Sequence, residues 1–450
     1  MDPSTPGFVL KSRRVVLPEG LRPAALLIHA GRIAAILPYD KIPLSCRIED
    51  VGNSVILPGL VDSHVHINEP GRTDWEGFET ATQSAALGGI TTLVDMPLNS
   101  DPVTTALPAF KTKIAATKGK LWVDVGFWGG LVHGNASKMS ELVVGGVLGI
   151  KAFMVHSGID DFTAATEEDM AAALPSLKAL NTPLLVHAEL DRKPAPKPAG
   201  ANYAAYVASR PPVWELDAID MLIRLCETTK AHVHIVHLAT AEALPRLEAA
   251  RKKGLPLTVE TCPHYIYFSA DKIPDGATQY KCAPPIRDEA NRRGLIDGLK
   301  SGVIDLIASD HSPCPPSMKQ LDTGNFGAAW GGIASLQVSL AAAWTALRPA
   351  GATPADIARW MSSAPAKLAG LTSSRGAIAE GLAADLVVWN PEASTVVRPE
   401  TLYHRHKVTP YAGQTLYGVV ERTYLKGVVV AEQGMVRTGA GGSPVLREVM

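Results

Sequence analysis

A chain of 450 residues is longer than the roughly 250 to 300 residues at which single hydrophobic cores stop growing, which favours one large and one smaller domain. Hydrophobic residues make up 46% of the chain, which argues against disorder. Basic and acidic residues nearly cancel, 43 against 44, so the charge excludes an obvious nucleic-acid or anionic-membrane partner and suits a small neutral substrate.

The chain opens with short apolar segments divided by Gly and Pro. ALLIHAGRIAAIL (25–37) predicts two strands around a turn, and RIEDVGNSVILPG (47–59) continues the pattern. The N-terminus, MDPSTPGFVLKSRRVVLPEG, has no apolar leader core, and no run of about 18 apolar residues occurs in the sequence. We therefore expect a β-rich opening segment in a cytoplasmic protein.

The middle of the chain alternates apolar runs with segments of helical spacing, such as 217–231 and 240–254. The eight predicted strands lie in VILPGLVDSHVH, GITTLVDMP, KLWVDVGFWGG, GVLGIKAFMV, TPLLVHAE, AHVHIVHLA, LPLTVETCPHY and VIDLIASDHSP. This alternation predicts parallel βα units and hence an α/β fold, a (β/α)8 TIM barrel, over residues 58–375.

The end of the chain returns to short strands and turns, in RGAIAEGLAADLVVWNPEAS (375–394) and VVERTYLKGVVVAEQG (419–434). We expect residues 1–57 and 376–450 to form one small β-sandwich domain together. Within the barrel region, RKPAPKPAG (192–200) is a Pro-rich loop that we expect to be mobile or to cover a site.

Metal-capable residues lie at the ends of several predicted strands. His64 and His66 point the same way because side chains alternate along a strand, so one cation can take both. In a barrel, the carboxyl ends of the strands converge on the active face. Six groups are therefore predicted to surround two metals: His64, His66, Lys151, His187, His237 and Asp310.

Lys151 and Asp310 have special parts in this hypothesis. A charged lysine would repel cations, but a neutral amine can add carbon dioxide and become N6-carboxylysine, a carbamate whose two oxygens can bridge two metals. Asp310 can bind one metal and act as a base. The alternatives are a lysine that reaches solvent and an aspartate that caps a turn or helix.

The other histidines and the cysteines have weaker cases. His133 and His232 show no convergent partner, and His234 is expected to pack behind the barrel. His264 is expected either to contact substrate or to support a ligand by a hydrogen bond. The odd number of cysteines and the absence of CxxC spacing predict free thiols in a reducing compartment; these are Cys46, Cys226, Cys262, Cys282 and Cys314.

Several segments together resemble the cyclic amidohydrolases of the amidohydrolase superfamily. They begin with PGLVDSHVHINEPGRTDWEGFETATQSAALGGITTLVDMPLNS and continue in order with GIKAFM, VHAE, VHLA, ETCPHY, CAPPIR, SDHSP and AWGGI. The resemblance extends from about residue 9 to residue 436. It implies that His64 and His66 bind one metal, that His187 and His237 bind the other, and that carbamylated Lys151 bridges them.

Two departures distinguish this chain from sister subfamilies. Dihydroorotases usually have an arginine at the position of Asn68, where it pairs with a substrate carboxylate. Dihydropyrimidinases and hydantoinases usually have a tyrosine at the position of His156. The resemblance therefore favours the branch that acts on an uncharged hydantoin bearing a urea group, and it leaves the oxyanion-stabilising group unassigned.

The implied reaction is hydrolysis of a cyclic amide by a metal-activated hydroxide, with Asp310 as general base and without a serine or cysteine nucleophile. Expected substrate contacts are Asn68, Ser157, Gly158 and His264, with Cys282 and Ala283 acting through main-chain groups. Zinc is the default metal, although manganese, cobalt and iron suit the same ligands. Relatives imply a homotetramer. The alternatives are a hydantoinase or dihydropyrimidinase and, as a non-enzyme, a scaffold protein of the same fold.

Overall fold

The predicted strands of the central region form an eight-stranded parallel sheet in the order β13-β12-β11-β10-β9-β8-β7-β6. The computed structural model describes residues 7–42, 46–192, 194–198, 200–437, 439 and 441–448. The strands are β6 (Leu60–Val65), β7 (Ile90–Asp95), β8 (Asp124–Leu131), β9 (Gly149–Phe153), β10 (Leu184–His187), β11 (Val233–Ile235), β12 (Leu257–Thr261) and β13 (Leu306–Ile307). Each lies in one of the eight predicted runs, with β8 extending one residue past its run, which confirms the α/β prediction.

The sheet curves round until its first strand meets the segment after its last. Val65 pairs with His311 in a parallel bridge, and the His66 N–H donates to the His311 carbonyl at 2.8 Å. These contacts lie at the carboxyl ends of the strands, where ligands bind in barrel enzymes. The barrel is thus nearly closed, and the segment that closes it carries Asp310.

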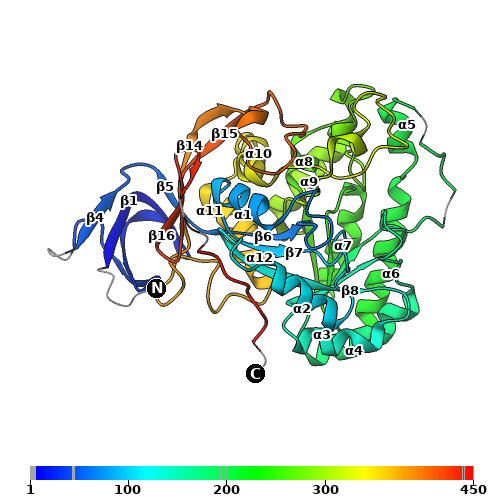
Figure 1. Ribbon diagram of the computed structural model, residues 1–450, viewed down its shortest axis with the longest axis horizontal. Coiled ribbons are helices and arrows are strands. Elements are labelled where there is room, and N and C mark those ends of the chain that lie inside the picture. The colour runs from blue at the N-terminus through cyan, green and yellow to red at the C-terminus, as the bar shows by residue number, and fades with distance from the viewer. Residues whose placement is uncertain are drawn as a thin grey trace.

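Helices surround the strands (Figure 1). They are α1 (Phe78–Leu87), α2 (Leu107–Ala116), α3 (Met139–Val144), α4 (Glu167–Ala179), α5 (Tyr203–Ala208), α6 (Pro212–Thr229), α7 (Leu244–Lys252), α8 (Pro263–Tyr267), α9 (Glu289–Ser301), α10 (Ser339–Leu347), α11 (Pro354–Ala358) and α12 (Ala364–Leu368). The helices predicted at 217–231 and 240–254 correspond to α6 and α7. Within the described part of the chain, none of the helices combines the length and apolarity that a bilayer span requires.

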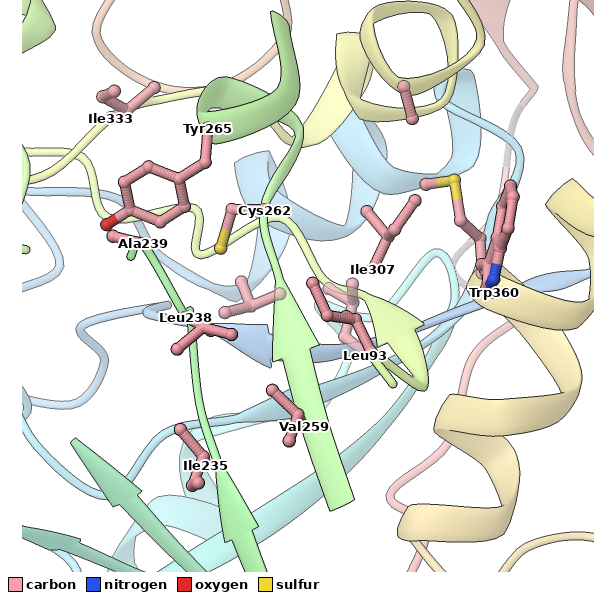
Figure 2. Packing of buried hydrophobic residues seen from close by; sticks show 14 of the residues in the cluster. Leu93, Ile235, Leu238, Ala239, Val259, Cys262, Tyr265, Ile307, Ile333 and Trp360 are labelled. Carbon is pink, nitrogen blue, oxygen red and sulfur yellow. The ribbon is translucent and has the colours of Figure 1, made fainter. Parts of the chain in front are cut away.

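Alternation along the strands separates the core from the site. Ile235 in β11 is in register with Val259 in β12, and both pack into the large apolar core, as Figure 2 shows. Their neighbours in sequence, His234 and Glu260, point to the opposite face because side chains alternate along a strand. In these two strands the polar residues face the barrel interior, whereas in β10 the inward residue is apolar, since Leu185 is in register with Lys151 and belongs to a second apolar cluster.

Both chain ends contribute to a second, nine-stranded sheet that is mostly antiparallel, with hydrogen-bonded order β17-β16-β15-β14-β5-β1-β2-β3 and β4 beside β1, counted over the described residues. Its strands are β1 (Phe8–Leu17), β2 (Gly20–His29), β3 (Arg32–Leu37), β4 (Arg47–Asp50), β5 (Val55–Pro58), β14 (Leu386–Val396), β15 (Thr415–Leu425), β16 (Val428–Glu432) and β17 (Met435–Val436).

The small sheet curls around a core of its own. Phe8 in β1 stacks on Tyr424 in β15 with ring centroids 6.0 Å apart, although β5 and β14 separate these strands in the ladder. The sandwich-like packing expected from the sequence therefore comes from one continuous curled sheet. We keep the boundaries 57/58 and 375/376 as a proposal; β5 ends at Pro58 and β6 begins at Leu60.

Candidate active site

His64, His66 and Asp310 meet at the carboxyl end of the barrel, within 4.8 Å of one another by their ligand atoms. Asp310 Oδ1 lies 3.3 Å from His64 Nε2 and 3.5 Å from His66 Nε2. Burial alone would raise the pKa of the Asp310 carboxyl, but His64 and His66 outweigh it and hold the pKa below its usual range. Asp310 is therefore an ionised, buried carboxylate that could bind a cation together with His64 and His66.

His187 and His237 form a second pair beside this group. His187 Nδ1 lies 2.9 Å from His237 Nε2, and the His237 ring is centred 5.4 Å from the His64 ring. Burial is the main reason that the pKa of His66 and of His187 falls to about 4. Neutral imidazoles keep a lone pair for a metal, so the arrangement fits two neighbouring cations.

Lys151 lies in the middle of β9, on the same side as Phe153, and is fully buried. Its Nζ has no hydrogen-bond partner among the described residues and lies 4.9 Å from the centre of the Phe153 ring. Burial lowers the pKa of the Lys151 ammonium to about 7. A buried amine that is partly neutral and has no partner fits the chemistry of carbamate formation.

Glu260 ties the two histidine groups together. Its carboxylate accepts from His64 Nδ1 at 2.5 Å and from the main-chain N–H of His237 at 3.2 Å. It also lies 3.1 Å from His234 Nε2. With Nδ1 engaged, His64 can offer only Nε2 to a metal. The expectation that His234 packs behind the barrel was therefore wrong: the alternation in β11 turns it toward Glu260.

Glu189 and Arg210 support the other histidine group. Glu189 accepts from His187 Nε2 at 2.7 Å. Arg210 donates two hydrogen bonds to the same carboxylate, from Nε at 3.1 Å and from a second guanidinium nitrogen. Burial would raise the pKa of Glu189, but Arg210 and His187 outweigh it, and the carboxylate stays charged. This leaves His187 Nδ1 as the atom available to a metal.

A cavity of about 750 Å³ opens onto the cluster, and five of the six predicted ligands line it: His64, His66, His187, His237 and Asp310. Lys151 lies beneath, fully buried. Residues 195–198 of the Pro-rich loop also line the cavity, which supports the prediction that this loop covers a site. Residues 193 and 199 of that loop lie outside the described residues.

The predicted substrate contacts divide into two groups. Ser157, Gly158 and Ala283 line the cavity. The Ser157 hydroxyl is already engaged, since it donates to the Phe162 carbonyl at 2.7 Å. Asn68, His264 and Cys282 are buried and outside the lining, so direct contact through their side chains would require a rearrangement. 

The hydrogen-bond partners of these three residues differ. Asn68 has a φ of 66°, and its amide lies 3.4 Å from the Pro313 carbonyl. The Cys282 carbonyl accepts from the Tyr206 hydroxyl at 2.6 Å, which occupies one lone pair of the main-chain group that was expected to bind substrate. Both imidazole nitrogens of His264 lack a described partner.

The protein-family comparison gives the decisive observation. The model of the amidohydrolase family matches residues 55–430, which is most of the chain. The chain belongs to the amidohydrolase family.

Whole-length relatives accompany this match. The amidohydrolase described here is 46% identical to the allantoinase of Streptomyces avermitilis, over 95% of this chain and 96% of that protein. It is 45% identical to the allantoinase of Saccharomyces cerevisiae, over 94% of each chain. Among solved structures, L-hydantoinase (dihydropyrimidinase) from Arthrobacter aurescens superimposes with a TM-score of 0.91 at 28% identity, covering 98% of this chain and 100% of that one.

The cysteines of this amidohydrolase are free, and all except Cys46 are buried. Burial raises the pKa of the Cys282 thiol to about 12 and also raises the pKa of Cys262. Thiolates are therefore scarce next to the cluster, which agrees with hydrolysis that uses no cysteine nucleophile.

Proposed function

We propose that this amidohydrolase is an allantoinase, which hydrolyses a ring amide of allantoin to give allantoate. The observation that carries the proposal is its identity of 43–46% to several allantoinases from bacteria, plants and yeast across nearly the whole chain. Allantoin is a neutral hydantoin bearing a ureido group, and it matches the uncharged substrate favoured by Asn68. The buried histidine and aspartate cluster supplies the chemistry.

We propose that His64, His66 and Asp310 hold one divalent cation and that His187 and His237 hold the other. The neutral state of the imidazoles and the 2.9 Å between His187 Nδ1 and His237 Nε2 support such a donor set. When bound, the cations lower the pKa of water and polarise a carbonyl oxygen. Nitrogen and carboxylate donors suit zinc, which we propose as the native metal, while manganese, cobalt or iron would also fit.

Lys151 is proposed to bridge the two cations as N6-carboxylysine. The neutral amine attacks carbon dioxide, an N–C bond forms as one C–O π bond opens onto oxygen, and the nitrogen releases one proton to water, which leaves a carbamate whose single negative charge is shared by two oxygens. Nζ has no hydrogen-bond partner among the described residues, which supports this assignment, because burying an unmodified amine without a hydrogen bond costs free energy. The carbamate would also offset the charge of the cations.

In the proposed reaction, Asp310 accepts the proton of the attacking water and passes it to the ring nitrogen that leaves as the amide C–N bond breaks. Its burial and its place between His64 and His66 hold the carboxylate in position for this transfer. Glu260 and Glu189 fix the orientation of the histidines, so they act as positioning residues.

We also propose that the enzyme is a homotetramer in the cytoplasm. The tetramer rests on the family resemblance, and five free cysteines support a reducing compartment. A small-molecule substrate is the only ligand class besides metals that the proposal requires.

The proposed function predicts a clear order of substrates. The purified enzyme with divalent metal should hydrolyse allantoin with kcat/KM about 100-fold above that for hydantoin or dihydrouracil, since two hydrogen bonds to the ureido group at about 1.5 kcal/mol each amount to about 3 kcal/mol. Release of allantoate is the measurement. Faster turnover of hydantoin or dihydrouracil would instead make the protein a hydantoinase or dihydropyrimidinase.

A further inference from the structure

Lys281 is a half-buried cation in the wall of the active-site cavity. It follows the short turn 278–280 and precedes Cys282. Its Nζ donates to the Ala329 carbonyl at 2.5 Å and lies 5.3 Å from the centre of the Tyr206 ring. Ala329 and Tyr206 also line the cavity, so the ammonium lies between two of its wall residues.

The charge of Lys281 is not neutralised by a neighbour. Among the described residues, none of the carboxylates comes within 4.0 Å of its Nζ, whereas the cavity's Arg210 is paired with Glu189 and its His156 lies 3.3 Å from Asp160. An ammonium has three hydrogens to donate, and the Ala329 carbonyl takes one. Lys281 therefore offers free, charged donors to an acceptor inside the cavity.

The position of Lys281 indicates which part of a substrate it meets. The metal-capable cluster lies at the strand ends, where β6, β10 and the segment after β13 converge. Lys281 contacts a different part of the cavity wall, formed by Tyr206 in α5, which is labelled in Figure 1, and by the segment around residue 329. A substrate bound with its reacting carbonyl at the cluster can extend its ring substituent into the part of the cavity that Lys281 lines.

We propose that Lys281 is a specificity-determining residue that binds the ureido carbonyl oxygen of the substrate. This inference rests on the proposed function, because allantoin differs from hydantoin by that ureido group. A charge-assisted hydrogen bond from the ammonium to the oxygen favours substrates with an acceptor at this position.

The test compares Lys281→Met with a matched control, Lys319→Met. Lys319 tethers the same segment, through the Trp330 carbonyl at 3.1 Å and the Gly332 carbonyl, but it is buried outside the cavity lining. Lys281→Met should raise KM for allantoin by about 10- to 100-fold, the equivalent of one hydrogen bond to a charged group, with a smaller change in kcat. The inhibition constant of hydantoin should change by less than about 3-fold.

Several outcomes would overturn the assignment. If KM for allantoin changed by less than about 3-fold in Lys281→Met, or rose equally in Lys319→Met, Lys281 would only hold the segment around residue 329 in place and would not bind the substrate. Equal weakening of allantoin and hydantoin would place its contact on the ring. Lys281→Arg keeps the cation and should retain most of the affinity, which guards against a misfolded Met variant. A wild-type enzyme without allantoin turnover would defeat the proposed function instead.

Discussion

Asp310→Asn is expected to lower the turnover of allantoin by about 10²- to 10⁴-fold, the usual contribution of a general acid–base group. The amide keeps an oxygen that can bind a metal, but it cannot accept and return a proton at neutral pH. The variant should therefore retain bound metal while kcat falls. Steady-state turnover and metal content of the same preparation are the two measurements.

Asp191→Asn provides a matched control, because Asp191 lines the same cavity but lies exposed and apart from the ligand cluster. It should retain nearly full turnover. If Asp310→Asn hydrolysed allantoin at close to the wild-type rate, Asp310 would not be the base. If the Asp310→Asn variant lost its metal, the loss of turnover would show only that Asp310 is a metal ligand.

Lys151→Ala is expected to abolish both metal binding and turnover, because it removes the only side chain assigned to both cations. The mutation also removes a fully buried side chain whose Nζ lies 4.9 Å from the centre of the Phe153 ring, and we expect a small carboxylic acid to enter the space that it leaves. Acetate or propionate should therefore restore part of the metal content and of the activity. Metal content and allantoin turnover should rise together as the acid is titrated.

Sodium chloride at the same ionic strength serves as the control for this rescue, and it should restore nothing. A Lys151→Ala protein that binds two metals without added acid would eliminate the carbamate bridge. Mass spectrometry of the wild-type protein under native conditions should in addition show one carbon dioxide adduct per chain that disappears in the variant.

The barrel was predictable because its signal is local. Each strand is a short apolar run, and the alternation within runs such as AHVHIVHLA separates the outward Ile235 from the inward His234. The gathering of His64, His66 and Asp310 followed from the rule that parallel strands end on one face. The same reasoning identified the other proposed ligands, His187, His237 and Lys151.

Contacts that depend on register or on distant segments were not predictable. Glu260 reaches His64 and His234 only because β12 lies beside β11 in the observed register. The period-two pattern of VETC was a signal for its inward position, but not for its partners. Arg210 meets Glu189 from the segment between α5 and α6, and nothing in the sequence around it indicates this pair.

Metal-dependent hydrolysis of allantoin is the central claim, and restoring metal to a chelated enzyme tests it most directly. The chelated protein should be inactive but folded, and activity should rise with added zinc until two ions are bound per chain. Allantoate formation and bound metal are measured on the same samples. Full allantoin turnover in the metal-free protein, or no turnover with two metals bound, would contradict the account.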